Sequence, residues 1–165
     1  MLFRSALTSS FPLPSLSVLD VGQGDGILLR PQGNALLLED TGPPGKHGIE
    51  APVCRSLERL GIGELDDVLL SHFDLDHRGG LSSLLARHRL RGALWFREED
   101  LSAKNHEAVL AEAERAGVPV RFLNEVNTPE GLLCRLAPFR DGNDSSPLCR
   151  AELDRKSTRL NSSHT

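Results

Sequence analysis

Residues 71–80 read Ser71-His72-Phe73-Asp74-Leu75-Asp76-His77-Arg78-Gly79-Gly80, and they follow the apolar run Val68-Leu69-Leu70. The apolar run predicts a buried β-strand. The stretch after it holds four side chains that can bind a metal ion, namely His72, Asp74, Asp76 and His77. The Gly-Gly pair then leads into a leucine-rich segment, which predicts a helix from Leu81. We therefore predict a metal site at the carboxyl end of a strand.

Histidine nitrogens and carboxylate oxygens are the ligands of catalytic divalent ions that keep a position open for water. In an extended segment, residues two apart point the same way, so His72 and Asp74 can share one ion. Asp76 and His77 fall on a tighter turn and can hold a second. Two ions about 3.5–4 Å apart activate water and stabilise a phosphoryl leaving group. Helix capping by Asp76 and solvated surface charge are the alternative interpretations of this stretch.

The rest of the chain predicts a layered α/β protein, because strands come first and then alternate with helices. Apolar runs predict strands at residues 16–20, 26–30, 35–39, 65–71, 93–96, 118–123, 132–136 and 148–153. The first three suggest an antiparallel meander, and their continuous apolar runs suggest a sheet covered on both faces. Apolar residues at helical spacing predict helices at 49–60, from 81, and at 105–116.

The ends of the chain look unlike the middle. The tail resembles translated sequencing-adapter DNA, and the head resembles the same adapter read from the opposite strand; a natural polar tail is the alternative. We predict adapter-like scars at 1–5 and 154–165, a linker at 6–15, and part of one domain at 16–153. No apolar run reaches the roughly 18 residues of a membrane span. The formal net charge is −4, and an acidic domain does not attract nucleic acid as a whole.

The central stretch resembles the metallo-β-lactamase superfamily, whose motif is H-x-H-x-D-H followed by glycine. It is more similar to one branch, the carboxy-terminal hydrolase domain of ComEC, the bacterial competence channel for DNA uptake. That branch also has an Asp-Val-Gly-Gln-Gly-Asp turn, a Leu-x-Asp-x-Gly loop, a Leu-Gly-Ile segment and an Asn-Asp-x-Ser segment. Here these stand at 20–25, 38–42, 60–62 and 143–146, so the resemblance runs from about Leu16 to Leu153.

The resemblance implies an αββα metallo-β-lactamase-like sandwich, of which this chain holds the amino-terminal part. It also implies a metal-dependent hydrolase with two divalent ions, zinc or manganese. Asp74 stands where most of the superfamily has histidine, which favours a harder ion such as manganese. Asp76 would be the catalytic residue that places or deprotonates the water. Asp40 would orient a ligand from behind the site, with loop capping as the alternative.

For the parent protein the resemblance implies DNA as a partner, an attached membrane channel domain and an extracytoplasmic hydrolase domain. No partner is evident for the fragment itself, which we expect to be soluble. The family's later ligands, an Asp in a Thr-Gly-Asp turn and a His in a His-His-Gly-Ser loop, have no counterpart after Leu148. We therefore expect weak or absent metal binding and no hydrolysis by this chain. A free-standing hydrolase of a small phosphoester, ester or thioester, and a non-catalytic binding module that keeps the fold, remain alternatives.

Several other residues are expected to lie outside the site. Asp20 and Asp25 are expected to fix the glycine turn rather than bind metal, and His47 and His106 to lie on the surface. Three widely spaced cysteines indicate ordinary thiols rather than a disulfide framework. A basic cluster follows the helix from Leu81, and we expect it to be a solvated face, with contact to a phosphate backbone as the alternative; it comprises Arg87, His88, Arg89 and Arg91.

Overall fold

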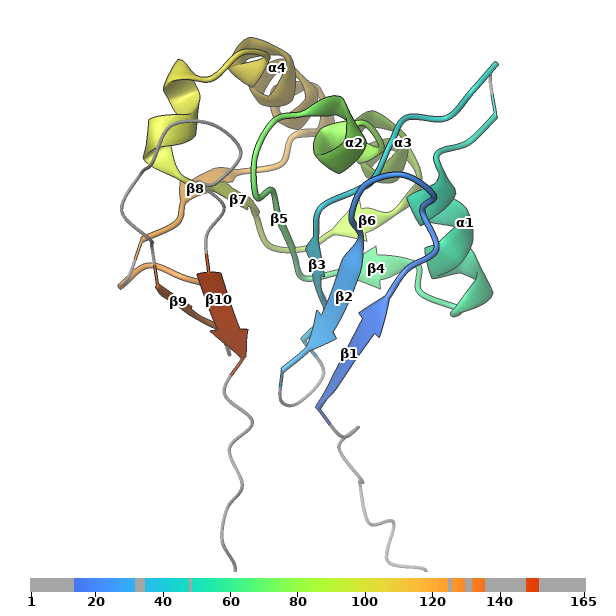
Figure 1. The fold of residues 1–165 in the computed structure, drawn as a ribbon, viewed down its shortest axis with the longest axis horizontal. Helices are drawn as coiled ribbons and strands as arrows, with labels where there is room; N and C mark the ends of the chain where they lie inside the picture. Colours follow the sequence, from blue (N-terminus) through green and yellow to red (C-terminus); the bar gives the residue numbers. More distant parts are fainter. Residues whose placement is uncertain are drawn as a thin grey trace, which may run out of the picture.

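The computed structural model describes residues 14–31, 35–47, 49–124, 126–129, 132–135 and 148–151. Its main sheet has the strand order β1-β2-β3-β5-β7-β8 (Figure 1). These strands are β1 (Ser15–Val18), β2 (Ile27–Arg30), β3 (Leu37–Glu39), β5 (Asp67–Leu69), β7 (Leu94–Phe96) and β8 (Val120–Phe122). Two smaller sheets pair β4 (Glu64–Leu65) with β6 (Arg89–Leu90), and β9 (Leu132–Arg135) with β10 (Leu148–Ala151).

The main sheet is mixed. β1, β2 and β3 run antiparallel, as the predicted meander requires, whereas β3, β5, β7 and β8 run parallel to one another. The carboxyl ends of β3 and β5 therefore lie at one edge of the sheet, and β2 begins at the same edge. In Figure 1 the loop from β1 to β2 arches over this edge beside α2 (Leu75–Arg78).

Strands β2, β3, β5 and β7 bury side chains on both faces of the sheet, as the continuous apolar runs predict. The prediction is wrong for β1, where Leu16 and Val18 are 63% and 76% exposed. On one face, Leu38, Val68 and Leu94 are buried in a core shared with the helices. These helices are α1 (Pro52–Arg59), α3 (Leu81–Arg87) and α4 (His106–Ala116). On the other face, Leu69 and Trp95 belong to a second buried cluster. An α/β protein with helices packed on a sheet is thus confirmed.

The helix predictions are confirmed with shifted boundaries. α1 begins at Pro52 rather than at residue 49, because proline suits the first turn of a helix, where its missing N–H is not needed. α4 ends where predicted, since Gly117 takes a left-handed conformation with φ of 67°. The four-residue helix α2 and the 3₁₀ helix η1 (Glu98–Ser102) were not predicted.

Some sequence predictions lie outside the described residues. These are the terminal segments 1–5 and 154–165, most of the linker at 6–15, and the motif at 143–146. The backbone places Cys134 directly opposite Cys149 in the β9–β10 pair, a proximity that their spacing in the sequence did not suggest. Over the described part of the chain, no helix has the length and apolar character that crossing a membrane requires.

Asp67 ties β5 to β7 and offers the first test of the fold. Its Oδ1 accepts hydrogen bonds from the Ala93 N–H at 2.9 Å and from the Trp95 indole N–H at 2.7 Å. Asp67→Ala should lower the free energy of unfolding by about 1–3 kcal/mol, because both donors lose their partner. The change can be measured by urea denaturation followed by the fluorescence of Trp95, the chain's single tryptophan.

Glu64→Ala is the matched control for Asp67→Ala. Glu64 is exposed and pairs with Arg89 at 3.5 Å and Arg91 at 3.9 Å. Exposed ion pairs contribute at most about 1 kcal/mol. Equal unfolding midpoints for the two variants would show that Asp67 does not join the strands.

Candidate metal centre

The site is assembled at the edge of the sheet where β3 and β5 end. Glu39 of β3 lies opposite Leu69 of β5 in the parallel register, and the Asp40 N–H donates to the Leu69 carbonyl at 2.8 Å. Asp40 and Ser71 therefore emerge side by side although 31 residues separate them. The stretch that holds the candidate metal ligands thus begins at the carboxyl end of a strand, as the sequence predicts.

The four predicted ligands lie together as two histidine–carboxylate pairs. The Nε2 atom of His72 is 3.7 Å from an Asp74 carboxylate oxygen, and the Nε2 atom of His77 is 3.9 Å from an Asp76 carboxylate oxygen. The two imidazole rings have centroids 3.9 Å apart. A tetrahedral ion with bonds of about 2.1 Å would hold its donors about 3.4 Å apart. Each pair thus fits a shared ion after a small adjustment, and the two pairs are adjacent.

Asp40 is hydrogen-bonded to both Ser71 and His77. Its side chain is buried, with Oδ1 accepting from the Ser71 N–H at 2.8 Å and Oδ2 accepting from the Ser71 hydroxyl at 2.7 Å. The same Oδ2 lies 2.8 Å from Nδ1 of His77. Because a carboxylate only accepts, this Nδ1 carries the proton, and the Nε2 atom of neutral His77 is free to bind metal. This geometry suits the predicted orienting role.

Asp25 lies nearer the site than its sequence interpretation implied. One oxygen of its exposed carboxylate is 3.8 Å from Nδ1 of His77. Ligand atoms of Asp25, Asp40 and His77 all lie within 4.8 Å of one another, a spacing that can hold an ion. We assign this trio to positioning His77 instead, because its Nδ1 already donates to Asp40. The sequence predicts that Asp25 fixes the glycine turn, and it gives no indication of the approach to His77.

Packing around α2 explains the glycines and Arg78. A Cβ atom at Gly79 would overlap Pro44, and one at Gly80 would overlap the Thr41 carbonyl oxygen. The two glycines therefore let α2 pack against the loop that carries Asp40. The sequence alone does not explain Arg78, but the structure gives it two contacts. Its Nε–H donates to the Phe73 carbonyl at 3.0 Å, and its guanidinium lies 3.9 Å from Glu112 of α4.

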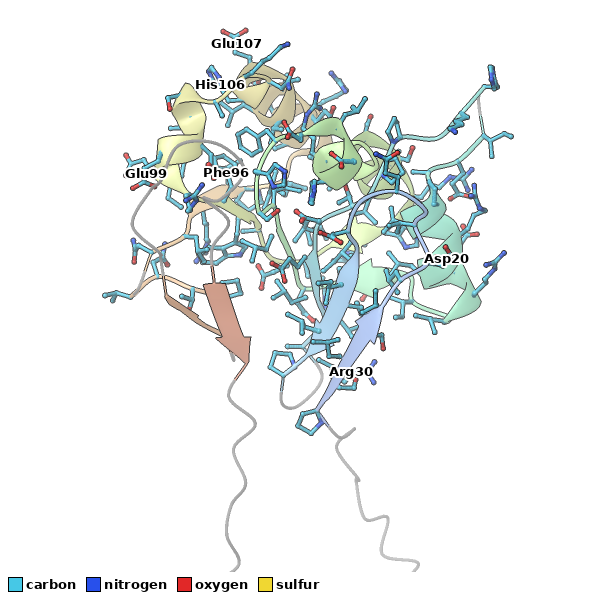
Figure 2. The ribbon with its side chains drawn as sticks, viewed as in Figure 1. Asp20, Arg30, Phe96, Glu99, His106 and Glu107 are labelled. Carbon is cyan, nitrogen blue, oxygen red and sulfur yellow. The ribbon has the colours of Figure 1, made fainter. Side chains whose placement is uncertain are left out.

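The remaining candidates lie away from the metal-binding side chains. The Asp20 carbonyl accepts from Ser56 of α1, and Figure 2 shows Asp20 beside that helix. His106 starts α4, with Nδ1 2.9 Å from the Ala103 carbonyl oxygen, and His47 is exposed. The arginines of the basic cluster are exposed and paired with acids, as expected for a solvated face; the closest contacts are Arg87–Glu50 at 3.0 Å, Arg91–Asp66 at 2.8 Å and Arg89–Glu64 at 3.5 Å. The expectation is wrong for His88, which is buried at 6% exposed.

A cavity of about 430 Å³ lies next to the start of α1, and none of the candidate metal-binding side chains lines it. Its walls come from the glycine turn at 21–23, the proline-rich loop at 43–46 and the start of α1. Figure 1 shows these two loops above α1. Lys46 and Arg55 line this cavity and supply positive charge in an otherwise acidic protein.

Two groups at the site, His77 and Glu39, have pKa values raised above their usual ones. The hydrogen bond to Asp40 raises the pKa of His77, while burial opposes the change. A proton therefore competes with a metal ion for His77 in mildly acidic solution. Burial, together with the charges of Asp40 and Asp25, raises the pKa of Glu39 from 4.5 to about 7, and His77 opposes this shift.

The Glu39 shift predicts how stability depends on pH. Because its carboxyl is protonated more readily in the folded state, folding takes up a proton, and stability should fall as pH rises from about 4.5 to about 7. In buffer with a chelator, Glu39→Gln should be more stable than the wild type at pH 8, by about 1–3 kcal/mol. Urea denaturation across this pH range measures the effect. Glu58→Gln on α1 is the exposed control, and an equal pH dependence in Glu39→Gln and wild type would contradict the assignment.

Comparison with known sequences agrees with the motif. The sequence profile of the Metallo-beta-lactamase superfamily matches residues 19–140. The Competence protein ComA of Neisseria gonorrhoeae is 37% identical over 70 residues, covering 42% of this chain and 10% of that protein. Recombination protein 2 of Haemophilus influenzae is 40% identical over 78 residues, covering 46% of this chain and 10% of that protein. The chain thus spans about a tenth of the length of these relatives.

Comparison with solved structures agrees with the architecture. A diphosphatase of the PhnP family superposes with a TM-score of 0.54 and 18% sequence identity. The match covers 76% of this chain and 47% of the diphosphatase. At this identity the likeness concerns the fold alone.

Proposed function

Because the chain belongs to the metallo-beta-lactamase superfamily, whose members are typically metal-dependent hydrolases, we propose that it carries the metal-binding half of a ComEC-type hydrolase domain. The proposed reaction of the whole domain is hydrolysis of phosphodiester bonds in DNA during uptake. The proposed cofactors are two divalent ions, with manganese favoured over zinc because Asp74 supplies oxygen in place of nitrogen.

The observation that carries the proposal is the adjacent placement of two histidine–carboxylate pairs. In each pair an Nε2 atom and a carboxylate oxygen lie 3.7–3.9 Å apart. On the other side of His77, an Asp40 carboxylate oxygen accepts a hydrogen bond from the protonated Nδ1. Side chains that merely covered a surface would not need a buried carboxylate to fix their orientation.

Each residue has a proposed role. His72 and Asp74 would hold one ion, and His77 and Asp76 the other. Bound ions of this kind lower the pKa of water and stabilise a phosphoryl leaving group. Asp76, half-buried beside His77, would also receive the proton of the attacking water.

Two further observations support DNA as the substrate. The first is the regional identity to a competence protein and a recombination protein, at 37% and 40%. Lys46 and Arg55 line the cavity next to the glycine turn, where they could contact a phosphodiester backbone.

Titration with Mn²⁺ tests the metal site in the purified chain. Paramagnetic broadening should reach the imidazole resonances of His72 and His77 before those of His47 and His106, even where affinity is weak. Earlier broadening of either control histidine would argue against the assigned ligands.

DNA cleavage tests the proposed reaction. A longer product of the same gene, extended past Leu153, should cleave single-stranded DNA with Mn²⁺ and fall to background in His72→Ala. Turnover of a small phosphoester or thioester without DNA cleavage would favour the free-standing hydrolase. Metal binding without any turnover would favour the non-catalytic module.

A further inference from the structure

Ser71 sits between Asp40 and His72 and belongs to neither histidine–carboxylate pair. It is 5% exposed. Its hydroxyl donates to Oδ2 of Asp40 at 2.7 Å and also lies 2.9 Å from Nδ1 of His72. The backbone N–H of Ser71 donates to the other Asp40 oxygen at 2.8 Å, which fixes the residue in place.

Counting protons decides the direction of the second contact. A serine hydroxyl has one proton, and a carboxylate can only accept. The proton of Ser71 is therefore used on Asp40, so the contact with His72 must be donated by the imidazole. Neutral His72 then carries its proton on Nδ1, and its Nε2 lone pair faces Asp74 at 3.7 Å.

We infer that Ser71 is a positioning residue, which transmits the tautomer preference of Asp40 to His72. Asp40 thus determines the tautomer of both histidines, that of His77 by direct contact and that of His72 through the serine hydroxyl. The tautomer that results is the one that leaves Nε2 free on each ring. The preference is needed because a neutral imidazole side chain in water favours the opposite tautomer, with its proton on Nε2. The tautomer follows from geometry alone, whereas its use in metal binding rests on the proposed function.

The test is ¹⁵N-detected histidine spectroscopy of the metal-free 165-residue chain at pH 8. In the wild type, His72 should show the pattern of a protonated Nδ1. Ser71→Ala should shift His72 toward the Nε2-protonated form, and Ser71→Thr, which keeps the hydroxyl, should restore the wild-type pattern. His106 is the internal control, because its Nδ1 contacts the Ala103 carbonyl rather than Ser71.

Two results would overturn the inference. One is an Nε2-protonated His72 in the wild type, a reading that does not depend on whether any variant folds. The other is an unchanged His72 pattern in a folded Ser71→Ala, with folding checked by Trp95 fluorescence. Affinity for Mn²⁺ should also fall about ten- to a hundredfold in Ser71→Ala and recover in Ser71→Thr. A protonated Nδ1 in a chain that binds no metal would support the tautomer assignment while counting against the proposed function.

Discussion

Asp40→Ala is expected to lower the free energy of unfolding by about 3–5 kcal/mol, the largest effect of any single change at this site. Asp40 is 2% exposed, and its removal leaves the Ser71 N–H and the His77 Nδ1–H without acceptors. An unsatisfied buried donor costs about 1–3 kcal/mol. Alanine must also adopt the left-handed backbone of this position, where φ is 57°.

Urea denaturation followed by Trp95 fluorescence measures this loss. Asp40→Asn should be less harmful than Asp40→Ala, because its amide oxygen can still accept one hydrogen bond from Ser71. Asp74→Ala is the matched control within the site, since the Asp74 side chain is 59% exposed and its removal should change stability by less than about 0.5 kcal/mol. An Asp40→Ala midpoint equal to that of Asp74→Ala would show that the Asp40 network does not stabilise the fold.

Gly24→Ala should destabilise the protein by about 2–5 kcal/mol and displace α2. Gly24 has φ of 98°, a conformation that side chains rarely adopt. A Cβ atom there would also overlap the backbone carbonyl of Asp76. The glycine turn and the metal-binding helix would have to separate, so Mn²⁺ affinity should fall together with stability.

Gly22→Ala separates the effect of backbone strain from the effect of the overlap with α2. Gly22 lies in the same turn with φ of 85°, but a Cβ atom there would meet nothing within 4 Å. Gly22→Ala should therefore lower the free energy of unfolding only by the backbone strain, about 1–3 kcal/mol, and leave metal affinity unchanged. Thermal unfolding and Mn²⁺ titration of both variants give the comparison. Equal losses would mean that contact between the glycine turn and α2 is unimportant.

The sequence could predict features that depend on residues close together in the chain. His72, Asp74, Asp76 and His77 lie within six residues, so their donor types and spacing suffice to predict two adjacent pairs. Their position after the apolar run was enough to place them at a strand end. The four-residue α2 was missed because it is barely one turn long, too short to show a helical repeat.

What the sequence could not predict depends on contacts between distant segments. Ser71 meets Asp40 only because β3 and β5 pair in parallel, and Asp25 approaches His77 only because β2 begins at the same edge. The identities of these residues do not indicate which strands lie next to each other. The raised pKa of Glu39 likewise depends on burial and on the charges of Asp40 and Asp25, all of which the fold brings about.

Arg78 links the loop of the candidate metal ligands to α4: it donates to the Phe73 carbonyl within the loop and pairs with Glu112 of α4. A side chain that bridges two segments makes it costly for either to open alone, so the two should exchange their amide protons as one cooperative unit. Residues 73–78 and 106–116 would then show matching protection, and Arg78→Leu would uncouple them. The order of the candidate metal ligands would then depend on a helix that contributes none of them.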